Sequence, residues 1–460
     1  MKKTIWLMLF CGLIILNIIS VADAKSNEEI YQEKLSQLKP DDAKGHYELG
    51  SWCVQNKLVE QAKAQFEKVL ELDPNHAGAH EKLGHVKYKD KWQTPEELKA
   101  QGLALYKGKW MPYDEAMKAQ GYVKFEDNWM LPKERDLIIK LDKSFPWTGS
   151  IDKPGADSEG LAWEKAREKE TEHFMVRTDL SVDALNDICF LMESAYFIWD
   201  DFFKLVNPND KTAAKSKEKF KVLVPKSRQE FEKVWEDSLG SQPPPMGKGA
   251  FIPKGEPSNK SREDKLLTYY FQQEDKKTTA NTLLHEGTHY AIILVQRAYL
   301  THKPPPIWLN EGLCTYFESG RIEGKKLVND NISQERFQYI QLAITDKTYI
   351  KLSDFINSPV SKYSYSQDSA SIYYPEGWSL IYFLSKGKDG KYKPCLQKYF
   401  DAWKSLKIDL QSDSKDLWIQ DKPGHVKLFE QCMGVPMDQL EQEWLDYISA
   451  LKTEEPPKQE

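Results

Sequence analysis

From about Trp163 onward, the pattern of hydrophobic positions predicts strands and helices in alternation. Residues 172–178 (EHFMVRT) and 219–225 (KFKVLVP) are short and rich in β-branched and aromatic residues, as expected of strands. Residues 182–206 and 228–238 are longer and have helical character, so each of these strands is followed by a predicted helix.

Two further strand candidates, 248–253 (KGAFIP) and 265–273 (KLLTYYFQQ), follow, and the rest of the chain to about Lys452 is mostly helical. A sheet followed by a helical half is the order of an α+β domain. We assign this domain to residues 163–455. The segment before it, 144–162, is rich in Gly, Pro, Ser and Asp, which indicates a linker.

The N-terminal region, residues 25–85, carries a different, purely helical pattern. A Leu-Gly pair at Leu49-Gly50 recurs 34 residues later at Leu83-Gly84, and Ala62, Phe66 and Pro74 lie between them at matching spacing. This pattern resembles the tetratricopeptide repeat (TPR) and predicts a helical hairpin. One such unit cannot bury its own apolar face, so it is either a packing spacer or part of a partner-binding surface.

Residues 86–143 contain a second, shorter repeat. Segments beginning at Tyr88, Tyr106 and Phe125 share one template: an aromatic residue, three turn-forming residues, a tryptophan and a short helix. The turn between the two aromatic residues predicts a small hairpin. The tryptophans either form the core of each repeat or bind a protein partner. They are Trp92, Trp110 and Trp129, spaced by 18 and 19 residues.

Composition and charge narrow the function classes. The chain has 460 residues, 64 of them basic and 70 acidic, for a net charge of -6. Such a length predicts two or three domains. The near balance of charges gives no argument for nucleic acid or an anionic membrane surface as a partner.

The first 24 residues have the organisation of a secretory signal peptide. Lys2 and Lys3 precede an apolar segment from Ile5 to Val21, and Ala22-Asp23-Ala24 has the small-x-small form of a cleavage site. We expect cleavage after Ala24 and a secreted or periplasmic protein with no integral membrane segment afterwards. An uncleaved membrane anchor is the alternative.

Five cysteines remain after residue 24, and their number and spacing do not indicate a disulfide framework. Cys395 and Cys432 either form a bridge or are isolated buried thiols. The absence of a Cys-x-x-Cys pair argues against a structural zinc site built from thiolates.

The segment LLHEGTHYAI, residues 283–292, carries the candidate chemistry. It lies in a predicted helix with Thr278 as a plausible N-cap, so His285 and His289 are one turn apart on one face and can reach one metal ion. Glu286 is placed to contact a water on that metal without binding it. The alternative is a pair of surface or core histidines.

A third ligand comes from the segment PPPIWLNEGLCTYFESG, residues 304–320. Pro306 and Gly320 bound a predicted helix in which Glu311 and Glu318 share a face. A metal ion explains two carboxylates on an apolar helix: Glu311 binds it, and Glu318 orients a histidine through its other ring nitrogen. His302 lies in a predicted loop that would not position it.

HEGTH followed by WLNEG resembles the gluzincin metallopeptidases, which include thermolysin and the alanyl-aminopeptidase and leukotriene-hydrolase family. The layout also resembles the peptidase-MA-like proteins of bacteria. This resemblance, over roughly residues 172–452, implies a zincin-like fold and a Zn²⁺ ion. YYPEG resembles the Tyr-x-x-Gly segment of the aminopeptidases, which implies that Tyr374, or else Tyr373, donates a hydrogen bond to the oxyanion.

The chain departs from that family in two respects. Twenty-one residues separate His289 from Glu311, a few more than in the aminopeptidases. The Gly-x-Met-Glu-Asn segment, which holds the free amino terminus of a substrate in that family, is absent. We therefore expect an endopeptidase, or a peptidase of unfamiliar specificity, acting on peptides or proteins, with an extended peptide pairing to 248–253 or 265–273.

The predicted mechanism is zinc-dependent hydrolysis of a peptide bond. Zinc on His285, His289 and Glu311 would lower the pKa of its bound water to about 7, Glu286 would act as the general base, and Tyr374 would stabilise the oxyanion. The alternative from another class is an exported interaction module whose metal site is vestigial or structural.

Overall fold

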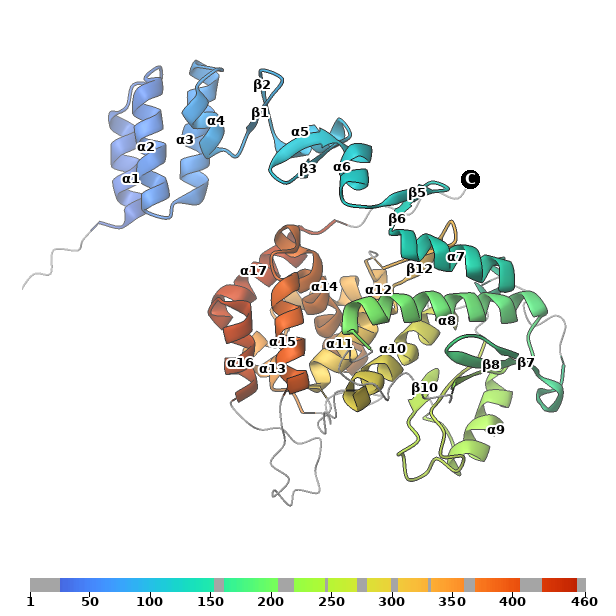
Figure 1. Ribbon diagram of the computed structural model, residues 1–460. Coiled ribbons are helices and arrows are strands. Elements are labelled where there is room, and N and C mark those ends of the chain that lie inside the picture. Colours follow the sequence, from blue (N-terminus) through green and yellow to red (C-terminus); the bar gives the residue numbers. More distant parts are fainter. Residues whose placement is uncertain are drawn as a thin grey trace, which may run out of the picture. The chain divides into compact units, whose positions relative to one another are not determined.

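The computed structural model describes residues 25–152, 161–205, 219–244, 247–270, 279–298, 305–329, 332–359, 369–405 and 424–452. The chain divides into two compact units, Met1–Tyr122 and Val123–Glu460. Figure 1 shows both as ribbons, and they are described separately here. The predicted signal peptide (1–24), Thr278 and His302 lie outside the described residues. No helix of the described part is long and apolar enough to cross a membrane.

The first unit begins with four helices, as the pattern in residues 25–85 predicts. Helices α2 and α3 form a hairpin in which Leu49, Ala62 and Phe66 are buried. A β-carbon at Gly50 would lie only 2.8 Å from the Phe66 ring, so the glycine permits the close approach of the two helices. The bounds are α1 (Asn27–Gln37), α2 (Ala43–Gln55), α3 (Val59–Leu72) and α4 (Ala77–Lys82).

The predicted hairpin-and-helix template is present three times. Residues of the hairpin turns have positive φ, such as Asp90 at 65° and Gly108 at 78°, which explains why the turns are polar or contain glycine. Trp92, Trp110 and Trp129 are half-buried. The copies are β1 (Val86–Tyr88), β2 (Lys91–Gln93) and α5 (Pro95–Ala100); β3 (Leu103–Tyr106), β4 (Lys109–Pro112) and α6 (Tyr113–Ala119); and β5 (Val123–Phe125), β6 (Asn128–Met130) and α7 (Pro132–Ser144).

The domain boundary differs from the predicted one. We predicted a single repeat region, 86–143, but the third copy forms a compact unit with the second half of the chain. The ammonium of Lys326 donates to the backbone carbonyl of Trp129 at 2.8 Å. The first residues of the expected linker are hydrogen-bonded to the second unit, because the side chain of Asp187 accepts the backbone N–H groups of Thr148, Ser150 and Ile151. Tertiary contacts of this kind leave no periodic signal in the sequence.

The second unit contains a five-stranded sheet in the order β10-β11-β9-β8-β7. The three central strands are parallel, and each edge strand is antiparallel to its neighbour. Four strands agree with the predicted segments, and β7 was not predicted. The strands are β7 (Arg167–Glu170), β8 (Phe174–Thr178), β9 (Phe220–Val224), β10 (Gly249–Ile252) and β11 (Lys265–Thr268).

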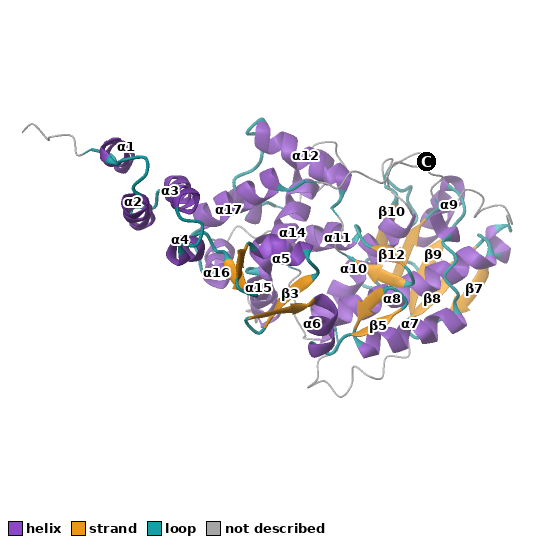
Figure 2. Cartoon of the chain, turned by 90° about the horizontal axis from the view of Figure 1, so that it is seen from above, coloured by secondary structure: helices purple, strands orange, loops and turns teal. Residues whose placement is uncertain are grey.

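Helices cover both faces of this sheet (Figures 1 and 2). Leu266 of β11 packs into the main core with α8 (Val182–Phe203) and α10 (Thr279–Ala298). The next residue, Leu267, packs on the other face against α9 (Arg228–Leu239). Alternate side chains of a strand point to opposite faces, so the buried strand is apolar on both sides.

The helical half follows α10, which confirms the α+β order at the level of elements. A short hairpin, which the sequence did not predict, interrupts it directly after the helix that carries Glu311. The elements are α11 (Ile307–Phe317), β12 (Arg321–Glu323), β13 (Lys326–Val328), α12 (Gln334–Thr345), α13 (Leu352–Ile356), a π-helical turn (Ser369–Tyr373), α14 (Tyr374–Gly390), α15 (Lys393–Ser405), α16 (Gly424–Met433) and α17 (Met437–Ala450). Cys395 and Cys432 are free cysteines, not a disulfide.

Candidate metal centre

Helix α10 presents two histidines on one face, as their spacing predicts. The ring centroids of His285 and His289 are 5.2 Å apart. The side chains are 14% and 17% exposed, so both rings are mostly enclosed by protein. Gly287, between them, faces α8: a β-carbon there would lie 2.3 Å from Trp199. The glycine of HEGTH therefore lets α10 cross α8 at close range.

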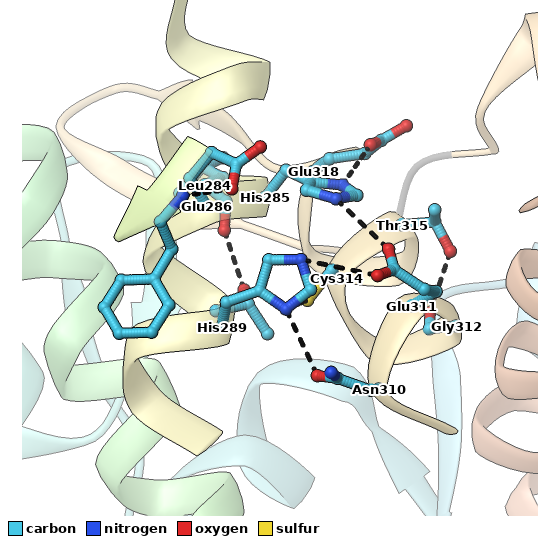
Figure 3. A network of polar contacts seen from close by, with 12 residues as sticks. Leu284, His285, Glu286, His289, Asn310, Glu311, Gly312, Cys314, Thr315 and Glu318 are labelled. Carbon is cyan, nitrogen blue, oxygen red and sulfur yellow. Dashed lines mark hydrogen bonds and ion pairs between the residues drawn. The ribbon is translucent and has the colours of Figure 1, made fainter. Parts of the chain in front are cut away.

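Helix α11 brings Glu311 to the same place. Its Oε2 lies 3.5 Å from Nε2 of His285, and its Oε1 lies 3.7 Å from Nε2 of His289. Figure 3 shows the carboxylate facing both rings. Oε2 of Glu311 is buried and makes no well-formed hydrogen bond, since Nε2 of His285 is 3.5 Å away. A buried carboxylate oxygen in this position fits a metal ligand, because a cation between it and the rings would be a better partner.

Two glycines permit this approach. A β-carbon at Gly312, next to Glu311, would lie 3.0 Å from the carbonyl oxygen of Gly377 in α14. A β-carbon at Gly377 would in turn lie 3.2 Å from the Cα of Gly312. The glycines of WLNEG and of YYPEG are thus the contact between α11 and α14. This contact also places Tyr374, at the start of α14, beside the histidines.

The ring nitrogens that face away from Glu311 have protein partners. Nδ1 of His285 donates to Oε2 of Glu318 at 2.8 Å, as predicted for the orienting carboxylate. Nδ1 of His289 lies 3.2 Å from the side-chain oxygen of Asn310 and 3.3 Å from the sulfur of Cys314. When the rings are neutral and Nδ1 is the donor on both, as metal binding requires, the lone pair of each Nε2 is directed toward Glu311.

Several of these groups could hold a metal ion. One nitrogen from each histidine and the sulfur of Cys314 lie within 4.8 Å of one another. Glu311 is the other donor, since its two oxygens face the two Nε2 atoms, whereas Cys314 approaches His289 from the Nδ1 side. The described residues therefore provide a group that could bind a metal ion.

The charges at the site favour a cation. Burial lowers the pKa of His285, but the adjacent carboxylates of Glu311 and Glu318 outweigh it and raise this pKa to about 10. Burial acts to raise the pKa of Glu311, and the neighbouring His289, His285 and Arg336 outweigh it, so that pKa is lowered. In the absence of metal, these two shifts favour a protonated His285 beside an ionised Glu311.

Cys314 has the opposite character. Its side chain is fully buried, and burial together with the nearby carboxylates raises the pKa of its thiol well above the usual value. The thiol is therefore the stable form at neutral pH, while metal ligation requires the thiolate.

Glu286 points to the edge strand of the sheet. Its Oε2 accepts the backbone N–H of Phe251 in β10 at 2.8 Å. Gly249, two residues earlier, makes room for this contact, since a β-carbon there would lie 2.6 Å from the methyl group of Thr282 on α10. Glu286 is therefore held near the histidines by a backbone group of β10, and its charge contributes to the raised pKa of His285.

Tyr374 and Tyr373 occupy different environments. The Tyr374 ring centroid is 6.5 Å from that of His285, whereas Tyr373 stacks on Phe355, with centroids 6.4 Å apart. A π-helical turn ends at Tyr373, and such turns often occur at functional sites. Of the two predicted candidates, Tyr374 is the one beside the histidines.

Similarity to known proteins covers the region of this site. Residues 279–401 match a family described as a protein of unknown function (DUF1570). The match spans α10 to α15 and so includes both histidines, Glu286, Glu311 and Tyr374. A search of curated proteins found no match.

Sequence reasoning did not identify Asn310, Cys314 and Arg336 as parts of the site. Asn310 directly precedes Glu311, and Cys314 follows it by about one helical turn. Helical spacing could therefore have indicated both residues. Arg336 is on α12 and binds Oε1 of Glu318 through two nitrogens, both at 2.6 Å. No local spacing could have indicated that residue.

Proposed function

We propose that this chain is a zinc-dependent peptidase of the gluzincin type, with Zn²⁺ held by His285, His289 and Glu311. The observation that supports the proposal most is the position of Glu311. Its carboxylate comes from a different helix than the histidines, faces both Nε2 atoms and has a buried oxygen without a well-formed hydrogen bond. Two histidines, one carboxylate and one open position for water are a known form of catalytic zinc site.

Glu311 is a better third ligand than Cys314. A zinc ion shared by the two Nε2 atoms would lie on the side of the rings that Glu311 occupies. Cys314 instead contacts Nδ1 of His289, and the raised pKa of its thiol opposes ligation. We assign Cys314 and Asn310 the role of fixing the His289 ring, and Glu318 the same role for His285.

The proposed chemistry is attack of water on a peptide carbonyl. Zinc in this site would make a hydroxide available near neutral pH. Glu286 accepts the proton of the attacking water and returns it to the leaving amine. The N–H of Phe251 holds the Glu286 carboxylate in place for this transfer. The hydroxyl of Tyr374 donates to the oxyanion, a contact whose loss costs about 3 kcal/mol in comparable enzymes.

The substrate we propose is an extended segment of peptide or protein. Strand β10 is the edge of the sheet and lies next to Glu286. An edge strand can pair with an extended peptide through backbone hydrogen bonds. The absence of a Gly-x-Met-Glu-Asn segment supports an endopeptidase, and the amino-terminal sequence supports a secreted or periplasmic location.

One observation favours the alternative function, an exported interaction module with a structural metal site. Cys314 completes a His-His-Cys group, and thiolate ligands are frequent in structural zinc sites. The hairpin-and-helix repeats would then supply the surface for a protein partner.

Metal analysis and a peptide-library digest test the proposal. We expect the purified protein to retain zinc and to cleave peptides in a reaction that a chelator stops and added zinc restores. Glu286→Gln should retain zinc and lose about 10²- to 10⁴-fold in kcat, the usual contribution of a general base. Zinc binding without any chelator-sensitive cleavage would support the structural site instead, and wild-type activity in Glu286→Gln would refute the assignment of the base.

A further inference from the structure

One buried guanidinium touches two parts of the candidate site. Arg336, on α12, is 6% exposed and approaches Oε1 of Glu318 with Nε and with one terminal nitrogen, each at 2.6 Å. The central carbon of the same guanidinium lies 5.4 Å from the centroid of the Tyr374 ring. Glu318 is the C-cap residue that follows α11, and Tyr374 is the first residue of α14, so Arg336 on α12 contacts the end of one helix and the start of another.

The two oxygens of Glu318 are divided between Arg336 and His285. Oε1 accepts from Arg336, and Oε2 accepts from Nδ1 of His285. A carboxylate held by two donors on one oxygen cannot rotate freely, so the position of Oε2 depends on Arg336. The orientation of the His285 ring depends on Oε2 in turn.

The guanidinium of Arg336 also contacts the Tyr374 ring. Its distance and placement are those of a cation–π contact, and the low exposure of Arg336 strengthens such a contact. The ring is therefore near both the Arg336 guanidinium and the His285 imidazole. One side chain thus supports both the imidazole and the tyrosine.

We propose that Arg336 is a positioning residue, which sets the His285 imidazole through Glu318 and the Tyr374 ring through its cation–π contact. This inference rests on the proposed function for its kinetic consequences, but its structural content concerns only the geometry of the metal ligands. It therefore has a readout that is separate from peptide cleavage.

An electrostatic role and a positioning role of Arg336 predict opposite effects on metal binding when the residue is removed. Three carboxylates gather at the site, those of Glu286, Glu311 and Glu318, and a divalent cation together with Arg336 balances them. A purely electrostatic Arg336 would repel the cation, so its removal would strengthen metal binding. A positioning Arg336 requires that removal weaken it.

Cobalt(II) provides the measurement, because its visible spectrum reports the geometry of its ligands. We would load the full-length protein with cobalt, record the spectrum and determine affinity by competition with a chelator. For Arg336→Met we expect a changed spectrum and an affinity about 10- to 100-fold lower, the usual effect of losing a partner of a metal ligand. kcat should fall by a similar factor, with little change in KM.

Arg336→Lys keeps the charge but lacks the planar fork that holds Glu318, and we expect it to restore cobalt affinity only in part. If circular dichroism shows that Arg336→Met does not fold, the Arg336→Lys variant tests the positioning role in its place. The matched control is Arg228→Met. Arg228 likewise pairs with a carboxylate, Glu232, and stacks on aromatic rings, but on α9 and away from the site. This variant should keep the wild-type spectrum and affinity.

A second pair of variants tests the contact with the ring. Tyr374→Phe keeps the ring that faces Arg336 and should leave the cobalt spectrum unchanged. Tyr374→Leu removes the ring, and the spectrum should shift in the direction seen for Arg336→Met. A wild-type spectrum for Tyr374→Leu, with a changed spectrum for Arg336→Met, would refute the part assigned to the ring contact.

The outcomes separate this inference from the proposed function. A folded Arg336→Met with wild-type spectrum and affinity, or with tighter binding, would overturn the positioning role whether or not the protein cleaves peptides. Absence of cleavage by the wild type, with the expected cobalt results, would overturn the peptidase proposal alone. A wild-type protein that binds no cobalt would overturn both.

Discussion

The two units of this protein place their polar groups differently. In the first, the ion pairs, such as Lys63–Glu67, are exposed, and the buried polar pair His46–Gln65 contains no carboxylate. In the second, the carboxylates of Glu311 and Glu318 are mostly buried. Burying carboxylates is costly unless cations or donors compensate them. Among the described residues, the second unit therefore buries carboxylates, which the first unit does not, and it pairs Glu318 with His285 and Arg336.

The largest expected effect is the loss of zinc affinity on substitution of Glu311, the proposed third ligand. It tests whether this buried carboxylate binds a metal ion. Glu311→Gln should lower zinc affinity by more than about 100-fold, since losing a mere partner of a ligand already costs about 10- to 100-fold. Cys314→Ser should change it far less. Competition with a chromogenic chelator measures both, and the reverse ranking would make the cysteine the ligand.

A core substitution in the first unit tests its independence from the site. Phe66→Ala removes a fully buried ring and should destabilise that unit by about 3–5 kcal/mol. Zinc affinity should not change, because the two units are separately compact. Denaturant unfolding and chelator competition on the same sample provide the comparison, and a loss of zinc affinity would show that the units are coupled.

Gly287→Ala tests the packing that positions the histidines. The added β-carbon would lie 2.3 Å from Trp199, so α10 must move away from α8. We expect a destabilisation of about 1–3 kcal/mol, as is usual for overpacking, together with weaker zinc binding. Gly108→Ala in the first unit is the control: it meets no neighbouring atom, although its positive φ adds local strain. Thermal unfolding of both variants with and without zinc measures this, and zinc should raise the Tm of Gly287→Ala less than that of Gly108→Ala.

The smallest expected effect is the pH dependence that results from protonation of His285. Because the pKa of His285 is raised to about 10 in the metal-free protein, the folded state holds a proton there that the unfolded chain loses above about pH 6.5. This stabilisation of the metal-free form is complete below pH 6.5 and disappears as the pH rises through about 10.

Zinc binding at pH 8 should therefore release about one proton from this histidine, and affinity should rise with pH over the same interval. Titration calorimetry in buffers of different ionisation enthalpy measures the release. His285→Ala should remove both the release and most of the affinity. Binding without proton release would contradict the protonated state of the metal-free site.

Periodicity and spacing predicted much of this structure, and the failures have a common cause. The strands β8 to β11, the helices between them and all three hairpin-and-helix copies follow from local patterns. The strand β7 (REKE) and the β12–β13 hairpin (RIE and KLV) were missed, because the charged segments REKE and RIE lack the apolar residues that mark a strand. The boundary at Tyr122–Val123 was also missed, since it depends on contacts such as that between Lys326 and Trp129.

The sequence by itself determined that His285 and His289 share a helix face and that Glu311 and Glu318 share another. Helical geometry makes both statements local. Only the tertiary structure decided that these two faces meet, that Tyr374 rather than Tyr373 lies beside them, and that Arg336 supports the arrangement from a third helix. Those facts depend on how helices pack, and at this site the packing is set by the contacts of Gly287 with Trp199 and of Gly312 with Gly377, which lie far apart in the chain.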